Sequence, residues 1–368
     1  MALELADIFR QYGPAYRQKY TSRMPANHFK AMRAIEQCRT QALGGQVYRC
    51  PNCEQVQYSY HSCRNRHCPK CQHENAQGWL DKQQALLLPV PYFLLTFTLP
   101  SGFNEVARSH QSLFYDLLFK TSAAATQQLA QEPRWLGGQI GMVGVLHTWG
   151  RNLAYHPHIH YLVPGGGWQD AEKRWVPARP DFLLPVRALS RVFRGKLRQA
   201  LRHTDCYARI PPNVWQQEWV VHCEGVGSGL NALKYLAPYI FRVALSNNRL
   251  LKLEGDRVTF RYRATDTGTE KRCTLSAEDF IHRFLQHVLP KNFVTVRYYG
   301  FFAATRRARL TALRHSLFPV ADLNARHTDQ PALSLGSAPL QPNTFLCPHC
   351  GQPMLFQHTL APLFCRSP

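Results

Sequence analysis

The sequence lacks several features that would define other classes of protein. No run approaches the roughly 20 consecutive apolar residues of a membrane-spanning helix, so we expect no membrane partner. The first residues have neither the charged start nor the apolar core of a signal peptide, which predicts a cytoplasmic protein. Acidic residues are scarce, with 23 Asp and Glu against 44 Lys and Arg and a net charge of +21. This excess predicts a polyanionic partner, first of all nucleic acid.

The 12 cysteines do not form the pattern of a secreted disulfide framework. They concentrate toward the two ends of the chain in C-x-x-C pairs interleaved with histidine, which is typical of zinc in a reducing compartment. The pairs Cys50/Cys53 and Cys68/Cys71, separated by fourteen residues, predict one tetrahedral structural zinc. Candidate ligands of a second zinc, for which free cysteine and solvated histidine remain the alternative, are Cys38, Cys63, His67 and His28.

A further C-x-x-C pair, Cys347 and Cys350, begins a zinc-ribbon-like element near the end of the sequence. Its remaining candidate ligands are His358 and Cys365. The chain therefore predicts one to three structural Zn²⁺ ions.

Periodicity predicts an α+β fold with a mixed sheet in the middle of the chain. We expect four regions: a helical zinc-binding region over 1–85, a catalytic domain over 86–317, a linker over 318–343 and the small C-terminal element over 344–368. Helical periodicity covers 3–20, 28–40, 103–131, 189–202, 230–245 and 277–288, and strand-like runs cover 92–99, 139–149, 158–163, 218–223, 257–263 and 293–299.

A histidine-rich strand carries the first candidate for chemistry. On a strand, His158 and His160 share one face, where two neutral imidazoles can bind one divalent ion. His147 ends a neighbouring apolar strand and is the preferred third ligand, while His156, on the same face as His158, is the alternative. A polar strand edge without metal is the competing interpretation.

Two tyrosines form the second candidate. Tyr235 and Tyr239 are four residues apart, so a helix places both phenols on one face. A tyrosine that attacks a phosphodiester forms a covalent phosphotyrosine, which conserves the bond energy for rejoining. Core packing is the ordinary explanation of such a pair, and the flanking Lys234 and Arg242 argue against it.

Basic residues next to these motifs are candidate DNA contacts. Arg64, Arg66 and Lys70 lie between cysteines, where a bound metal would hold them toward a phosphate backbone. A second basic group, Arg306, Arg307 and Arg309, precedes the linker. Solvated charge without a partner is the alternative for both groups.

Four segments in the same order carry a resemblance to a known family: HSCRNRHCPKCQ (61–72), VLHTWGRNLAYHPHIHYLVPGGG (145–167), YLAPYIFRVALSNNRL (235–250) and FLQHVLPKNFVTVRYYGF (284–301). With them, the chain resembles the two-tyrosine HUH transposases of the insertion-sequence-ninety-one family. The resemblance implies a central antiparallel HUH-type sheet with packed helices, Mg²⁺ or Mn²⁺ at His158 and His160, and nucleophiles at Tyr235 and Tyr239. The spacing from His147 to the pair is similar to that of three-histidine relaxases.

The activity implied by the resemblance is rolling-circle transposition of an insertion sequence. One tyrosine cleaves a single-stranded end of the element and keeps the 5′ phosphate, while the second cleaves another strand, including target DNA, before strand transfer. Host replication factors are further candidate partners, and the oligomeric state is left open.

Three other functions compete with this interpretation. A conjugative relaxase or plasmid replication initiator shares the histidine and tyrosine chemistry, although the cysteine cluster favours the transposase. A non-catalytic zinc-finger DNA-binding protein explains the charge and cysteines but leaves the histidines and tyrosines as coincidences. A zinc hydrolase needs a carboxylate base, and the segment 145–167 contains no Asp or Glu.

Overall fold

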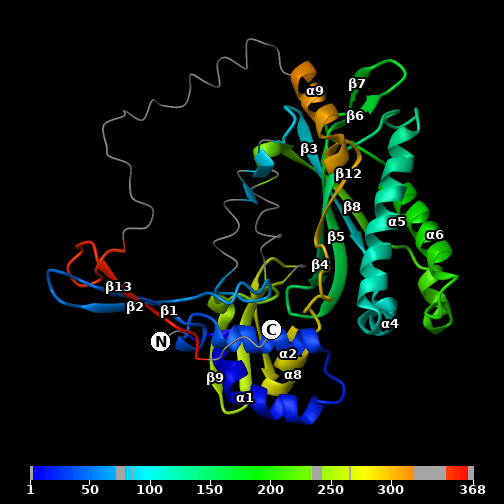
Figure 1. Ribbon diagram of the computed structural model, residues 1–368. Coiled ribbons are helices and arrows are strands. Elements are labelled where there is room, and N and C mark those ends of the chain that lie inside the picture. Colours follow the sequence, from blue (N-terminus) through cyan, green and yellow to red (C-terminus); the bar gives the residue numbers. More distant parts are fainter. Residues whose placement is uncertain are drawn as a thin grey trace, which may run out of the picture.

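The computed structural model describes residues 3–71, 79–80, 82–84, 86–231, 233, 243–264, 267–317 and 345–363 (Figure 1). Over these residues the fold is α+β, as the sequence predicted. The paired strands of its sheets are antiparallel, as the resemblance implied, whereas periodicity had predicted a mixed sheet. None of the helices in this part of the chain combines the length and apolar character needed to cross a membrane.

A five-stranded sheet with the order β12-β4-β5-β3-β8 forms the centre of the larger body (Figure 1). Most of its strands form where the sequence is rich in β-branched and aromatic residues, and the bounds of all five lie within five residues of the predicted runs. They are β3 (Pro91–Thr98), β4 (Met142–Trp149), β5 (Tyr155–Pro164), β8 (Val221–Ser228) and β12 (Val296–Tyr299).

Helices α4 (Asn104–Ser109), α5 (Gln111–Gln131) and α6 (Val186–Leu201) pack on one side of this sheet (Figure 1). They cover the side chains of Ile159, Tyr161 and Val163, which are fully buried. The sequence predicted one helix over 103–131, but the backbone at His110 (φ −130°, ψ 45°) is not helical and separates α4 from α5. This buried layer is the main hydrophobic core.

The opposite face of the sheet has a second, smaller core. There Val143, Val145 and Leu162 pack with Leu310 and Leu313 of α9 (Arg307–Leu317). This cluster covers only part of the face. Beyond it, the same face of β4 and β5 carries His147, His158 and His160.

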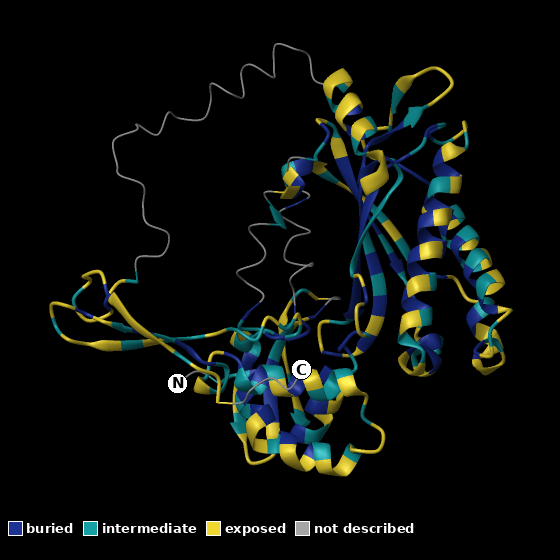
Figure 2. Cartoon of the chain, in the orientation of Figure 1, coloured by how far each residue is buried: buried dark blue, intermediate teal, exposed yellow. Residues whose placement is uncertain are grey.

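A separate helical body lies beside the sheet. Helices α1 (Leu5–Tyr20), α2 (Ala26–Gln37) and α8 (Ala277–Leu285) pack together with the three-stranded sheet β11-β10-β9, and Figure 2 shows buried residues where they meet. The strands are β9 (Leu250–Glu254), β10 (Arg257–Arg263) and β11 (Glu270–Ser276). The N-terminal helices thus share their core with residues that the sequence placed in the catalytic domain, because the apolar face of α8 is turned toward them. The domain boundaries themselves stay a prediction.

The two ends of the chain meet in a third small sheet with the order β13-β1-β2 (Figure 1). It consists of β1 (Gly45–Arg49), β2 (Val56–Tyr60) and β13 (Leu355–Leu360). The remaining described elements are the hairpin strands β6 (Gly166–Gln169) and β7 (Arg174–Pro177) and the 3-10 helices η1 (Gln41–Leu43), η2 (Ser101–Phe103), η3 (Tyr207–Arg209), η4 (Pro212–Trp215), η5 (Asn247–Arg249), η6 (Gly300–Phe302) and η7 (Ala304–Arg306).

Candidate metal centre and cysteine clusters

Three histidines converge on the open part of the central sheet. In the pairing of β4 with β5, His147 lies opposite His158, and Val145 lies opposite His160. The side chains share a face, and the three potential nitrogen ligands all lie within 4.8 Å of one another. Since two ligands of one ion, each about 2.1 Å from it, are at most about 4.2 Å apart, small ring rotations suffice for a common ion.

Hydrogen bonds to Nδ1 orient His158 and His160 on β5. The Nδ1 atom of His158 lies 2.7 Å from the carbonyl oxygen of His156, which can only accept, so Nδ1 carries the proton. The Nδ1 atom of His160 lies 2.9 Å from the hydroxyl oxygen of Thr96 on β3. Both contacts leave Nε2 for a ligand role, as hydrogen bonds to the other ring nitrogen do for histidines in metal sites. Sequence reasoning missed Thr96; its position as a hydroxyl within an apolar strand is the signal that could have shown it.

The environment keeps these imidazoles neutral. Burial, aided by the neighbouring His160, lowers the pKa of His158 to about 3. Burial lowers the pKa of His160 to about 4. His147 is 3% exposed and its ring stacks on Trp149 at 5.1 Å between centroids. Neutral imidazoles are the form that binds divalent metals, so this donor set fits such an ion.

The structure brings His147 into the group with His158 and His160, whereas the side chain of His156 lies outside it. His156 is exposed at the start of β5. The pairing of β4 with β5 shifts between His147 and Trp149, so that Trp149 lies opposite Tyr155. His156 contributes through its backbone carbonyl oxygen instead.

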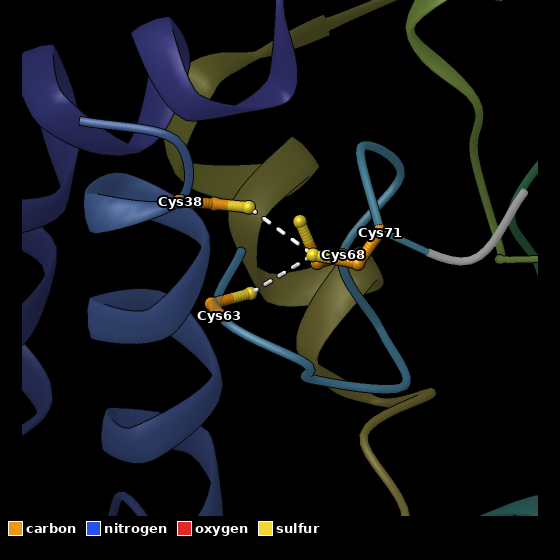
Figure 3. A group of neighbouring side chains, drawn as sticks. All are labelled: Cys38, Cys63, Cys68 and Cys71. Carbon is orange, nitrogen blue, oxygen red and sulfur yellow. Dashed lines mark hydrogen bonds between the residues drawn. The ribbon is translucent and has the colours of Figure 1, made fainter. Parts of the chain in front are cut away.

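Four cysteines meet where α2 ends. Cys38 follows the helix, and Cys63, Cys68 and Cys71 come from the loop after β2, with their thiols turned toward one another (Figure 3). The sulfur of Cys71 is 3.2 Å from that of Cys38 and 3.6 Å from that of Cys63. Four sulfurs at this spacing form the donor set of a tetrahedral structural zinc.

A second group of four consists of Cys50, Cys53, Cys347 and Cys350. The structure therefore groups the cysteines differently from the sequence prediction, which combined Cys50 and Cys53 with Cys68 and Cys71. The reason is that β2 separates these two pairs, whereas the pairing of β13 with β1 carries Cys347 and Cys350 to the first pair.

The other predicted zinc ligands lie elsewhere. His67 is half-buried; desolvation of its ring lowers its pKa to about 3, and its Nε2 accepts a hydrogen bond from the backbone N–H of Leu289. His28 is outside both groups, and burial lowers its pKa to about 4. His358 is exposed on β13, and Cys365 lies outside the described residues.

Comparison with known proteins connects these features to a family. A family model described as "Transposase zinc-binding domain" matches residues 8–99, and one described as "Putative transposase" matches residues 141–309. A curated relative, "Putative transposase y4qJ" of Sinorhizobium fredii, is 42% identical over 329 residues, which cover 84% of this chain and 82% of the relative. The chain belongs to the IS91 family of transposases.

A second relative of the transposase is the "Transposase for insertion sequence element IS801" of Pseudomonas savastanoi pv. phaseolicola. It is 30% identical over 283 residues, which cover 72% of this chain and 68% of the relative. No solved structure matches the chain. Membership of the family gives the protein a role in processing DNA, and the zinc-binding model together with the cysteine groups supports bound Zn²⁺.

The predicted nucleophiles of the transposase, Tyr235 and Tyr239, lie outside the described residues, as do Lys234 and Arg242. The segments on either side are described. Leu233 is buried with Val145 and Leu162, on the sheet face that carries the histidines. Leu245 is buried in the helical body, where Trp149, the residue stacked on His147, also packs.

Several predicted DNA contacts are engaged within the protein. Lys70 pairs with Glu4 at 2.6 Å, and Arg66 donates to the carbonyl oxygen of Phe293 at 2.7 Å. Arg309 forms an ion pair with Asp170, and Arg307 lies over the ring of Tyr298. These arginines face the protein because α9 packs on the sheet, whereas Arg64 and Arg306 are exposed.

We expect His147→Gln to weaken Mn²⁺ binding to the zinc-loaded transposase by at least about tenfold, because it removes one of the three candidate ligands. His156→Gln keeps the backbone carbonyl and should change the affinity by less than about threefold. Electron paramagnetic resonance of free Mn²⁺ measures both affinities. A larger loss in His156→Gln than in His147→Gln would reverse the assignment.

The pKa values of His158 and His160 are lowered to about 3 and about 4, so protons compete with the metal for these two side chains only in acid. The Mn²⁺ affinity of the wild type, measured in the same way, should therefore change little between about pH 8 and about pH 6.

Proposed function

We propose that this transposase cuts and rejoins single DNA strands through a 5′-phosphotyrosine intermediate during rolling-circle transposition. In this proposal His147, His158 and His160 hold Mg²⁺ or Mn²⁺ in an HUH-type site, and Tyr235 and Tyr239 are the nucleophiles. The observation that carries the proposal is the convergence of the three histidines on one open sheet face.

The chain path supports a tyrosine next to these histidines. Leu233, two residues before Tyr235, packs in the cluster that contains Val145, the residue opposite His160. Six residues after Tyr239, Leu245 packs in the body that also contacts Trp149. The described residues on either side of the tyrosines thus pack in clusters that also contain sequence or strand neighbours of the histidines.

The chemistry requires few groups from the protein. The phenolic oxygen attacks phosphorus and loses its proton, the bond from phosphorus to the 3′ oxygen breaks, and that oxygen takes up a proton as it leaves. The divalent ion, when bound, polarises the scissile phosphate and spreads its developing charge. Thr96 and the His156 carbonyl keep the imidazoles in place. Because the phosphotyrosine conserves the bond energy, a free 3′ hydroxyl can reverse the step without ATP.

A basic groove supports single-stranded DNA as the substrate. A cavity of about 2180 Å³ lies between the helical body and the start of α5, and its described lining contains no Asp or Glu. Arg64 and Arg66, which the sequence predicted as DNA contacts, line it. Such a groove can follow a phosphate backbone electrostatically. Its other basic side chains are Lys30, Arg33, Arg39, Arg108 and Lys291.

The family favours a transposase over the relaxase and initiator alternatives, because both curated relatives are named as transposases. A zinc-finger protein without catalysis gives no reason for three histidines to meet on one sheet. We therefore propose DNA strand transfer as the function of this transposase.

Covalent trapping tests the nucleophiles. With Mn²⁺ and a single-stranded oligonucleotide of the element's end, we expect wild type to form a protein–DNA adduct that survives denaturation. The double variant Tyr235→Phe/Tyr239→Phe should lose the adduct by more than about 100-fold, since no phenol remains to attack. Tyr262→Phe, on β10 in the helical body, is the matched control and should keep it. An adduct in the double variant would assign the nucleophile elsewhere.

The groove is tested by salt dependence of binding, measured without divalent metal to prevent cleavage. Arg64→Ala/Lys291→Ala removes two exposed lining cations, and each phosphate contact contributes about 0.7 to the slope of log affinity against log salt. We therefore expect the slope to fall by about 1.4. Arg187→Ala/Arg191→Ala on α6, outside the groove, is the charge-matched control. Equal effects of both pairs would show that total charge, and no particular groove, binds the strand.

A further inference from the structure

Two short segments from opposite ends of the chain have the same sequence pattern. Residues 50–55 read C-P-N-C-E-Q, and residues 347–352 read C-P-H-C-G-Q. They share both cysteines, the proline after the first cysteine and the glutamine two places after the second. A separation of nearly 300 residues makes this a match between two independent segments.

The backbones of the two segments are also alike. In the first, the N–H of Cys50 donates to the Gln55 carbonyl (2.9 Å), and the N–H of Glu54 donates to the Cys50 carbonyl (3.0 Å). The second repeats both bonds, from Cys347 to Gln352 (2.8 Å) and from Gly351 to Cys347 (2.9 Å).

The residue after the second cysteine has a left-handed backbone in both segments. Its φ is 60° at Glu54 and 73° at Gly351. Glycine adopts this conformation freely, whereas any other residue, such as Glu54, adopts it at an energetic cost. The need to hold the two cysteines of each turn in the same position accounts for the left-handed backbone in both segments.

The two turns face each other reciprocally. The sulfur of Cys50 is 3.4 Å from that of Cys350, and the sulfur of Cys53 is 3.5 Å from that of Cys347. Four sulfurs each about 2.3 Å from one tetrahedral zinc lie about 3.8 Å apart. The observed spacing is close to this value and far beyond the roughly 2.05 Å of a disulfide.

We propose that Cys50, Cys53, Cys347 and Cys350 together bind one structural zinc ion, which fastens the C-terminal strand to the N-terminal hairpin. The family model for the zinc-binding region covers residues 8–99 and includes neither Cys347 nor Cys350. The proposal does not depend on the strand-cutting chemistry.

Apolar packing alone gives this small sheet little stability. Its buried cluster consists of Cys50, Cys347 and Met354, with Tyr48 and Phe345 stacked beside them. Most of β13 is exposed, as Figure 2 shows. Elements with so small a core generally fold through a metal or crosslinks, and their metal-binding energy is folding energy.

Competing ligands are engaged elsewhere or turned away. Cys68 and Cys71 complete a group of four with Cys38 and Cys63. They are therefore not available as ligands for an ion bound by Cys50 and Cys53. His358, which the sequence offered for the C-terminal element, is exposed on β13 and outside the group.

The ion would link parts of the chain that are far apart in sequence. α9 lies at the opposite end of the molecule from β13 in Figure 1, and the two are joined through residues 318–344. β13 is the third strand of its sheet and covers the edge of β1. Loss of the C-terminal cysteines therefore also removes a zinc ion from the N-terminal hairpin.

Zinc content of the full-length protein tests the shared site. Cys347→Ser/Cys350→Ser should reduce zinc, measured by mass spectrometry of the metal, by about one ion per chain, and Cys50→Ser/Cys53→Ser should do the same. The quadruple variant should lose no more than either pair. A loss of about two ions in the quadruple variant, or no loss in either pair, would overturn the proposal. His358→Ala and Cys365→Ser are the controls and should leave the zinc content unchanged.

Thiol protection gives a second measurement that needs no change in the N-terminal hairpin. In Cys347→Ser/Cys350→Ser, Cys50 and Cys53 should react with N-ethylmaleimide more than about tenfold faster than in wild type, because zinc no longer protects their thiolates. Cys38, Cys63, Cys68 and Cys71 should keep their wild-type rates, as peptide mass mapping would show. Unchanged protection of Cys50 and Cys53 would contradict the shared ion.

Discussion

The antiparallel register of β4 against β5 is the constraint on which the candidate site depends. It sets His147 opposite His158 and puts His160 on the same face. A slip of one residue would turn the β5 histidines toward α5 and bury them in the main core. Packing in that core holds the register. Gly144 lies opposite Tyr161, and a Cβ atom at position 144 would lie 2.5 Å from the Tyr161 ring. The Tyr161 hydroxyl is in turn hydrogen-bonded to Ser122 of α5. Packing on one face thus fixes the chemistry on the other.

Features with a short range in sequence could be predicted well. Alternation along 158–163 was enough to place two histidines on one face and Ile159 and Tyr161 on the other, because side-chain direction in a strand has a period of two residues. The run 257–263 forms β10 with the predicted bounds for the same reason. His147 required a further assumption, that its strand pairs directly with β5, and the structure shows this pairing. The roles of Tyr235 and Tyr239, inferred from their spacing, their basic flanks and the resemblance, stay predictions.

Features that depend on the path of the chain could not be predicted. Two C-x-x-C pairs separated by fourteen residues fit one zinc site on spacing alone, yet β2 carries them apart and Cys38 and Cys63 complete one set. Nothing local shows that Cys347 lies beside Cys53. Likewise, the amphipathic pattern of α8 predicts a buried face but not that α1 covers it. Thr96 stands out in the sequence as a hydroxyl within an apolar strand, but its contact with His160 follows only from the pairing of β3 with β5.

The proposed function requires a covalent bond between this transposase and DNA. Locating that bond tests the proposal most directly. Wild-type protein would be incubated with Mn²⁺ and the single-stranded element end, the DNA would be trimmed by nuclease, and the peptides would be sequenced by tandem mass spectrometry. The account predicts a nucleotide joined through its 5′ phosphate to Tyr235 or Tyr239. A nucleotide on another residue, a 3′-phosphate linkage, or strand cleavage without any peptide adduct would contradict it.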